Sequence, residues 1–410
     1  MTTKKPNILF ITIDQLRADC LDEKSERVVN TPNLDALAAQ GVRFANHFTQ
    51  ASPCGPSRAS LLTGTYLHTH QSVFNGTPLD AKFTNVAKEF RKSGYDPLLF
   101  GYTDTTIDPR TTTEDDPRLL TYEGHLPGFK VVLPLPEDRD AWYKWLAKKG
   151  HDISDRSKFL EGSEGIEIPS GRGETWPPSP YERDETETAF VIEEVISHLE
   201  NLPEPWFLHV SILRPHPPFV VPAPYNDLYD PAEVSEPIAF SESDHPFIDS
   251  LSKIDFFKAP STSIDRRQLK ATYYGMVTEV DDQIGRLTNY LHEKGLEENT
   301  ILLVTSDHGE YLGDHGEWRN PDTTINWNVA VQKNAAGAHV PDSGPFAGMR
   351  LGYHNTIDGL PSKWGADTTI RRFSTNSHNC YGGISKIKID SDNFRYEVGV
   401  DLRSYKAYHR

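Results

Sequence analysis

The 410-residue sequence predicts an α/β fold, in which one large, doubly wound and mostly parallel sheet is flanked by helices. Two observations predict it. Four short runs rich in β-branched and other apolar residues recur along the chain, and nearly continuous apolar runs of this length are typical of strands covered on both faces. Segments with helical spacing of apolar residues lie between these runs, and such alternation favours a parallel sheet.

The predicted strands are residues 7–13, 97–102, 206–212 and 300–305. The predicted helices are residues 33–41, 85–93, 186–200 and 263–295. In the last helix apolar residues recur at intervals of three and four, and Gly295 suits a helix C-cap. A hairpin is predicted at 384–400, with its turn at 390–393.

The chain is long enough for one large core and a smaller second lobe, because single cores stop growing at roughly 250–300 residues. Residues 113–184 are rich in proline, glycine and charge, and we interpret them as an insertion over one end of the sheet. From Trp318 onward the apolar residues follow neither the strand nor the helix period. We therefore predict one domain over 1–318 and an atypical, truncated or aberrant segment over 319–410, for which poor order is one expectation.

Composition argues against several classes of protein. The formal net charge of −17 leaves no general basic surface, so we expect no nucleic-acid partner. We expect no membrane association, because no segment approaches the ~20 apolar residues of a membrane span. The first apolar run is interrupted at Asp14, so no signal peptide is predicted. Three widely separated cysteines, Cys20, Cys54 and Cys380, are typical of a reducing compartment, and a cytoplasmic location is expected.

Polar side chains follow the predicted strands where each strand ends. They include Asp14, Gln15, Tyr102, Asp104, His216, Asp307 and His308. The carboxyl ends of parallel strands share one edge of a sheet, and ligands bind there. Asp14, Asp307 and His308 would suit Ca²⁺, Mg²⁺ or Mn²⁺, with the imidazole favouring Mn²⁺ and zinc less favoured. The alternative is that each aspartate only caps the next helix.

The stretch SPCGPSRASLLTG at 52–64 places Cys54 between two prolines. The prolines favour an extended turn, and the next residues open a helix whose N-terminus favours an anion. Arg58 could hold a tetrahedral oxyanion through two N–H groups. A small buried cysteine is the structural alternative. A simple cysteine nucleophile would need a histidine partner, which no local signature supplies.

These residues resemble the sulfatase family of the alkaline phosphatase superfamily. CGPSR at 54–58 matches the CxPxR signature, and NILFITIDQLRAD, TPNLDALAAQGVRFANHF, RPHPPF and TSDHGEYLGDHG resemble further sulfatase blocks in the same order. Gln15 in place of a second aspartate, together with the blocks GYDPLLFGYTDTTIDPRTT and ATYYGMVTEVDDQIGRL, is most similar to the phosphonate monoester hydrolase and phosphodiesterase branch. The resemblance covers about residues 5–318 and implies an alkaline phosphatase-like fold.

The resemblance implies that Cys54 is converted to formylglycine by a formylglycine-generating enzyme. The hydrated aldehyde would attack phosphorus or sulfur and later expel phosphate or sulfate. One divalent metal ion, Mn²⁺ or Ca²⁺ with Mg²⁺ also possible, would be bound by Asp14, Gln15, Cys54, Asp307 and His308. Arg58 would orient the nucleophile, and His216 would protonate the leaving oxygen. The residues lining the substrate oxygens would be Asn75, Tyr102 and Asp104.

We therefore expect a metal-dependent hydrolase of small anionic esters, namely phosphonate monoesters and phosphodiesters, with sulfate esters as overlapping substrates. An arylsulfatase or alkyl sulfate-ester hydrolase is the alternative within the class. An inactive sulfatase-like protein is the alternative outside it, because the segment after Trp318 departs from the family. In that segment Arg319 could take the place of a lysine that binds the substrate in other members of the family. Whether the protein assembles into a homo-oligomer stays open.

Other polar residues receive structural interpretations. His209 lies in the middle of a predicted strand and is expected to pack in the core, and Cys20 is expected to be buried and inert. The acidic run at 279–282 is interpreted as a solvated surface of the long helix.

Overall fold

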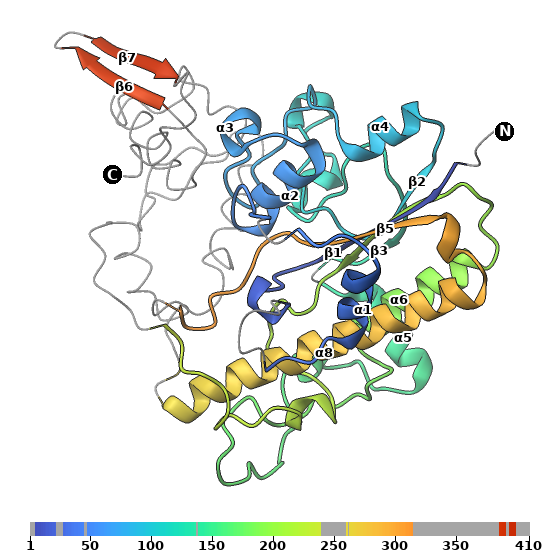
Figure 1. The fold of residues 1–410 in the computed structure, drawn as a ribbon, viewed down its shortest axis with the longest axis vertical. Coiled ribbons are helices and arrows are strands. Elements are labelled where there is room, and N and C mark those ends of the chain that lie inside the picture. The colour runs from blue at the N-terminus through green and yellow to red at the C-terminus, as the bar shows by residue number, and fades with distance from the viewer. Residues whose placement is uncertain are drawn as a thin grey trace.

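A computed structural model describes residues 5–21, 28–44, 47–136, 138–238, 260, 262–314, 385–390 and 393–398, the last two ranges as backbone only. Five parallel strands form its central sheet, in the order β3-β2-β4-β1-β5 (Figure 1). They are β1 (Asn7–Ile13), β2 (Pro97–Gly101), β3 (Lys130–Pro134), β4 (Phe207–Ile212) and β5 (Thr300–Ser306). The four predicted strands are confirmed, each bound to within one residue.

Strand β3 is the element of the sheet that the sequence did not predict. It lies within 113–184, the segment interpreted as an insertion, and pairs in parallel with β2. The same segment holds α5 (Asp140–Lys149). Only two valines and a leucine mark β3, between an exposed lysine and a proline, and this run is too short for a clear apolar pattern. The segment therefore forms one edge of the sheet.

Helices cover both faces of the sheet, as doubly wound folds require (Figure 1). One side carries α1 (Pro32–Gln40), α5, α6 (Glu187–Leu199) and α8 (Ser263–Glu293). The other side carries α2 (Cys54–Thr63), α3 (Leu67–His70) and α4 (Val86–Lys92). The four predicted helices are therefore confirmed as α1, α4, α6 and α8. Short 3₁₀ helices span Ala18–Cys20, Pro109–Thr111, Pro117–Leu120, Arg156–Leu160, Tyr225–Asp227 and Glu297–Asn299.

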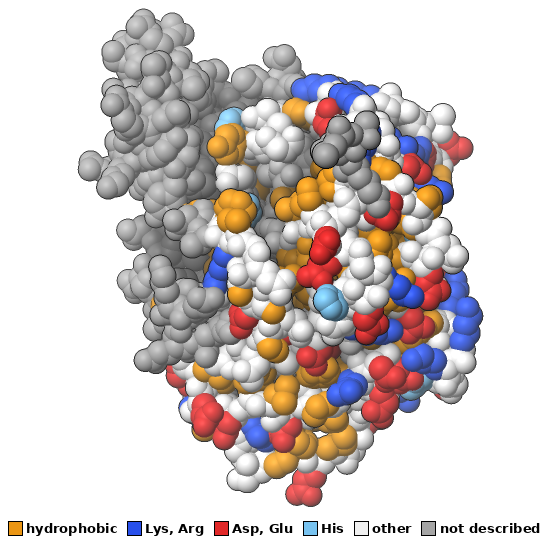
Figure 2. All heavy atoms as spheres, turned by 45° about the vertical axis from the view of Figure 1, so that its right-hand side comes forward, with side chains coloured by type: hydrophobic (Ala, Val, Ile, Leu, Met, Phe, Trp, Pro, Cys, Tyr) orange, Lys and Arg blue, Asp and Glu red, His pale blue; other side chains and the backbone are white. Residues whose placement is uncertain are grey.

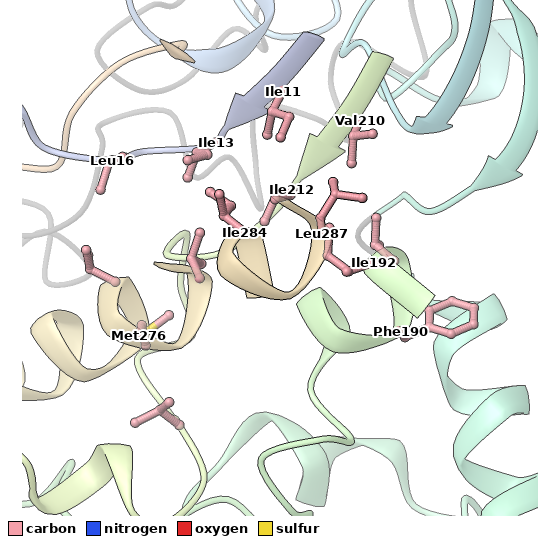
Figure 3. Packing of buried hydrophobic residues seen from close by; sticks show 14 of the residues in the cluster. Ile11, Ile13, Leu16, Phe190, Ile192, Val210, Ile212, Met276, Ile284 and Leu287 are labelled. Atoms are coloured by element: carbon pink, nitrogen blue, oxygen red, sulfur yellow. The ribbon is translucent and has the colours of Figure 1, made fainter. Parts of the chain in front are cut away.

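The larger core lies between the sheet and the layer of α6 and α8. Side chains of β1 and β4, such as Ile11 and Ile212, pack there with Ile284 and Leu287 of α8 (Figure 3). Thr262 caps α8, because its hydroxyl accepts a hydrogen bond from the backbone N–H of Asp265. No described helix is long and apolar enough to cross a membrane. On the described part of the face in Figure 2, basic and acidic side chains are interspersed.

The acidic run of α8 is not the solvated surface that the sequence suggested. Glu279 is buried and accepts hydrogen bonds from the hydroxyls of Thr186 and Thr188. Asp281 is also buried and accepts from the backbone N–H groups of Asn33 and Leu34 in the first turn of α1. The expectation was wrong because α8 packs against both α1 and α6, so its polar positions meet the ends of neighbouring helices.

The parallel pairing fixes the level at which the strands end. Ile13, the last residue of β1, pairs with Ile212 of β4 and with Ser306 of β5. Asp14 and Asp307 are therefore the first residues beyond the paired part of two neighbouring strands. The register brings both carboxylates to the same edge of the sheet.

The hairpin predicted near the C-terminus is confirmed by β6 (Ser385–Asp390) and β7 (Asn393–Val398), which pair antiparallel with Asp390 opposite Asn393. Residues 315–384 and 399–410 lie outside the described part of the chain. They include Arg319, the candidate substrate-binding residue, and Trp318, where the strand and helix periods of the apolar residues end. The domain boundary at 318 stays a prediction.

Candidate functional site

Four buried side chains converge at the carboxyl edge of the sheet. Asp14, Cys54, Asp307 and His308 each offer a ligand atom, and these atoms all lie within 4.8 Å of one another. Nε2 of His308 lies 3.1 Å from Sγ of Cys54 and 3.7 Å from Oδ1 of Asp14. The residues come from the end of β1, the start of α2 and the end of β5. The convergence expected of the strand ends therefore includes the cysteine.

The His308 ring is oriented for binding a cation. Its Nδ1 lies 2.8 Å from the backbone oxygen of Gly309. A carbonyl oxygen only accepts hydrogen bonds, so Nδ1 carries the proton and the lone pair of the neutral ring is on Nε2. That nitrogen is the one within reach of Cys54 and Asp14, so the imidazole has the tautomer a metal ligand needs.

Gln15 directly follows Asp14, and its backbone N–H donates to Oδ1 of Asp307 at 3.1 Å. Its side chain is buried, and its Nε2 donates to the carboxylate of Glu310. Among the described residues Oε1 of Gln15 has no hydrogen-bond partner. Buried polar atoms normally have partners, and an amide oxygen is a ligand that hard divalent cations accept. The atom has the chemistry of the further metal ligand that the resemblance implies, and an amide that only supports the other ligands is the alternative.

The charges of the cluster also suit a divalent cation. The buried guanidinium of Arg58 lies 2.7 Å from Asp307, 3.0 Å from Asp14 and 3.9 Å from Asp104. These three carboxylates carry a formal charge of −3 against +1 on Arg58, and buried charge needs compensation. Burial alone would raise the pKa of Asp307, but His308 and Arg58 hold it below its ordinary value. The carboxylate form is the one that binds a cation.

Arg58 and Tyr102 hold the buried carboxylates of this cluster in place. The Nη1 of Arg58 donates to Ser211 at 2.7 Å, while its Nε and Nη2 donate to Asp307 and Asp14. The Tyr102 hydroxyl donates to Asp14 Oδ2 at 2.5 Å, and its ring centroid lies 4.3 Å from the guanidinium carbon. Arg58 was expected to orient the nucleophile and Tyr102 to line substrate oxygens. In the structure both donate to Asp14.

Asn75 and Asp104 lie at the first turn of α2. The Oδ1 of Asn75 accepts from the backbone N–H of Gly55 at 2.6 Å. A Cβ at position 55 would come within 2.8 Å of that oxygen and 3.3 Å of the Asp104 carbonyl oxygen, so glycine is needed beside Cys54. Asp104 itself has a left-handed backbone with φ of 47°. These predicted substrate-lining residues therefore surround the N-terminus of the helix that begins at Cys54.

His216 lies in the loop that follows β4. Its Nδ1 is 2.8 Å from the Pro217 carbonyl oxygen, so Nε2 is the basic nitrogen of the neutral ring. Arg214 holds this loop by donating from Nη1 to the carbonyl oxygens of His216 and Pro218. Burial raises the pKa of Glu310, against smaller opposing effects of the backbone N–H groups of Leu312 and Tyr311 and of His308 and His216.

Sequence reasoning missed two residues that support the site. Glu310 accepts from Gln15, and the Tyr273 hydroxyl donates to the Gln15 carbonyl oxygen at 2.6 Å. The position of Glu310, two residues after His308, was a usable signal. Tyr273 lies on α8, and nothing local connected it to Gln15.

His209 and Cys20, which were interpreted as packing residues, are buried as expected. His209 stacks on Phe10, and burial together with Arg58 lowers its pKa to about 3. Cys20 is buried, and burial raises the pKa of its thiol. A neutral imidazole and a protonated thiol are compatible with the packing roles predicted for them.

Comparison with known proteins agrees with the site. The Sulfatase family model matches residues 6–345. The multifunctional alkaline phosphatase superfamily protein PehA of Trinickia caryophylli is 39% identical over 340 residues, covering 77% of this chain and 65% of that protein. An arylsulfatase of Clostridium perfringens is 32% identical over 324 residues, with the same two coverages. The chain thus spans slightly less than two thirds of the length of these curated relatives.

The fold also matches a solved structure. The phosphonate monoester hydrolase of Agrobacterium radiobacter superposes with a TM-score of 0.69 at 39% identity, covering 77% of this chain and 67% of that one. The alkaline phosphatase-like fold expected from the resemblance is therefore confirmed.

Proposed function

Because the chain belongs to the sulfatase family, we propose that it is a metal-dependent ester hydrolase whose nucleophile is a formylglycine made from Cys54. The single observation that carries this proposal is the placement of Cys54 among Asp14, Asp307 and His308. We further propose phosphonate monoesters and phosphodiesters as substrates, with sulfate esters cleaved as well. The 39% identity to a phosphonate monoester hydrolase supports this choice.

The side chains proposed to hold the metal ion are Asp14, Gln15, His308, Asp307 and the modified residue 54. Carboxylate and amide oxygens with one imidazole suit Mn²⁺ or Ca²⁺, and Mg²⁺ is the third candidate. When bound, the ion supplies Lewis acidity that makes a hydroxyl at position 54 a better nucleophile. Arg58 and Tyr102 hold Asp14 in place for this task, and Arg58 does the same for Asp307.

The modified side chain would serve both halves of the reaction. A hydrated aldehyde carries two hydroxyls, so one can attack and the other can later expel the product by breaking a C–O bond. In the first half, the bond from phosphorus or sulfur to the leaving oxygen breaks, and that oxygen takes a proton. We assign this proton to Nε2 of His216, which donates it from the imidazolium form, with both ring nitrogens protonated, and leaves the neutral ring with its proton on Nδ1. Asn75 and Asp104 are proposed to face the remaining substrate oxygens.

A sulfate-ester hydrolase is the second candidate, because the arylsulfatase of Clostridium perfringens is 32% identical to this chain. The proposal requires a formylglycine-generating enzyme as a partner, and the cytoplasm stays the predicted location.

Relative turnover of a phosphonate monoester and an aryl sulfate separates the phosphonate monoester hydrolase from the sulfate-ester hydrolase. The better substrate is the one with the higher kcat/KM at equal Mn²⁺ concentration.

The experiment is mass spectrometry of the tryptic peptide 44–58 from protein purified from its own host. The same preparation is assayed with a phenylphosphonate monoester, a phosphodiester and an aryl sulfate in the presence of Mn²⁺. An aldehyde at position 54, with turnover that Cys54→Ala abolishes, would support the proposal. An unmodified thiol without turnover would overturn it and would favour an inactive sulfatase-like protein.

A further inference from the structure

We propose that Glu310 is a positioning residue, which turns the amide of Gln15 so that its oxygen faces the metal site. This inference rests on the proposed function, because it assumes that a divalent cation binds beside Gln15. Both side chains are buried, with 4% of Glu310 and none of Gln15 exposed. They touch through a hydrogen bond from Nε2 of Gln15 to Oε2 of Glu310.

The need for a positioning residue follows from the chemistry of an amide. A carboxylate has two equivalent oxygens, so either rotamer presents a ligand atom. A glutamine has one oxygen and one NH₂ group of nearly equal size, and only the oxygen binds a cation. A turn of 180° about the last torsion of Gln15 would direct two N–H donors at the ion. Something must therefore distinguish the two ends of this side chain.

Glu310 is itself held in one orientation. Its Oε1 accepts from the backbone N–H groups of Tyr311 and Leu312, at 2.7 and 3.3 Å. Arg17 donates from Nη1 to the carbonyl oxygens of Glu310 and Tyr311, at 2.7 and 2.9 Å. With Oε1 committed to the backbone, Oε2 is the oxygen directed at Gln15. A carboxylate oxygen only accepts, so it selects the NH₂ end of the amide.

The backbone of Gln15 is fixed as well. Its N–H donates to Oδ1 of Asp307 at 3.1 Å, and its carbonyl oxygen accepts from Tyr273 at 2.6 Å. The residue has a left-handed backbone, with φ of 67°. With both peptide groups held, side-chain rotation is the freedom that remains. Glu310 removes it, and Oε1 of Gln15 is left buried without a hydrogen-bond partner among the described residues.

The test measures Mn²⁺ affinity of the full chain by isothermal titration calorimetry after metal is removed with a chelator. Glu310→Gln places an NH₂ group where Oε2 stood, so the Gln15 amide must turn and its oxygen leaves the cation. The dissociation constant for Mn²⁺ should rise about 10- to 100-fold, as for other partners that orient metal ligands. Glu310→Asp keeps the charge but withdraws the acceptor, and the same direction of change is expected.

A compensating variant separates orientation from charge. In the Gln15→Glu, Glu310→Gln double variant, the new carboxylate accepts from the new amide and still offers an oxygen to Mn²⁺. Affinity should return to within about threefold of the original. If charge alone matters, Gln15→Glu will tighten Mn²⁺ binding by the same factor whether residue 310 is Glu or Gln. That additive result would overturn the inference.

Two controls make the failures distinguishable. Glu279→Gln neutralises another buried glutamate, away from Gln15, and should leave Mn²⁺ affinity unchanged. Thermal unfolding of the metal-free variants reports whether they fold. If Glu310→Gln does not fold, the Mn²⁺ affinities of Glu310→Asp and of the double variant test the inference. No Mn²⁺ binding by the unaltered protein would overturn the proposed function and this inference with it. Equal affinity in all the Glu310 variants would overturn only the role of Glu310.

Discussion

At the scale of single residues, the buried guanidinium of Arg58 holds two carboxylates that would otherwise repel each other. We predict that Arg58→Met destabilises the metal-free protein by about 3–5 kcal/mol, the usual cost of leaving buried charge without its partner. Mn²⁺ should restore part of this loss, because the cation supplies the missing positive charge. Urea unfolding with and without Mn²⁺ measures both effects.

Arg139 provides the matched control for that experiment, since it is a buried arginine paired with Glu187 at 3.1 Å. Arg139→Met should cost a similar amount of stability, and Mn²⁺ should not restore it. Equal rescue of both variants, or of neither, would contradict the compensating role given to Arg58.

His216 carries a prediction about leaving groups. Its removal should matter most where the leaving oxygen is a poor one, because general acid catalysis contributes about 10²–10⁴-fold only when the departing group needs a proton. We expect His216→Ala to lower the rate of cleavage of an alkyl ester at least tenfold more than that of a nitrophenyl ester. The quantity measured is the first-order rate constant of cleavage in single-turnover experiments. His209→Gln alters a core histidine and should lower both rates by the same factor. Equal slowing of both esters by His216→Ala would remove the proton-donor assignment.

At the scale of elements, α8 provides the N-terminal cap of α1. Asp281 accepts from the first backbone N–H groups of that helix, and it is buried, so water cannot replace it. We predict that Asp281→Ala lowers the free energy of unfolding by about 1–3 kcal/mol for each N–H group left without an acceptor. Chemical denaturation measures the change.

The control lies one residue further along the same helix. Asp282 is exposed and accepts from the Tyr225 hydroxyl at 2.7 Å, so Asp282→Ala should cost less than Asp281→Ala. The reverse order would show that the capping contact contributes little.

At the scale of the whole molecule, Glu279 links stability to pH. Burial raises its pKa to about 7, against smaller opposing effects of the Thr186 and Thr188 hydroxyls and of Arg214, while Asp282 adds to the rise. In the unfolded chain the carboxyl ionises near pH 4.5. Between these values the folded state binds more protons, so this group makes the protein less stable as pH rises from about 4.5 to 7, and the loss is complete above 7.

Glu279→Gln should remove that dependence. Relative to the unaltered protein, the variant should gain stability as pH rises through this window, by an amount on the order of 3 kcal/mol at pH 8. Denaturation midpoints at pH 5 and pH 8 test the prediction. A difference between the two proteins that is the same at both pH values would contradict it.

The sequence predicted elements whose signal is local and failed where the signal comes from contacts. The continuous apolar run of β1 identified the strand and placed Asp14 at its end, and CGPSR at 54–58 identified the start of α2. Strand β3 was missed because its apolar run is short. The burial of Glu279 and Asp281 was missed because their partners belong to α1, α6 and the turn before α6. The role of Glu310 could not be predicted, because it depends on a hydrogen bond to Gln15, which is far away in the sequence.

The pairing of β1 with β5 ties the relative position of Asp14 and Asp307 to the register of these two strands. Asp14 and Asp307 each follow a residue of the pair Ile13 and Ser306. Strands can shift against each other only by whole residues, about 3.3 Å at a time, and each single step turns every side chain to the opposite face. The pairing of the residues that precede the two aspartates therefore changes by whole residues or not at all. A substitution that shifts this register by one residue would turn Asp14 or Asp307 to the opposite face of the sheet and remove it from the cluster.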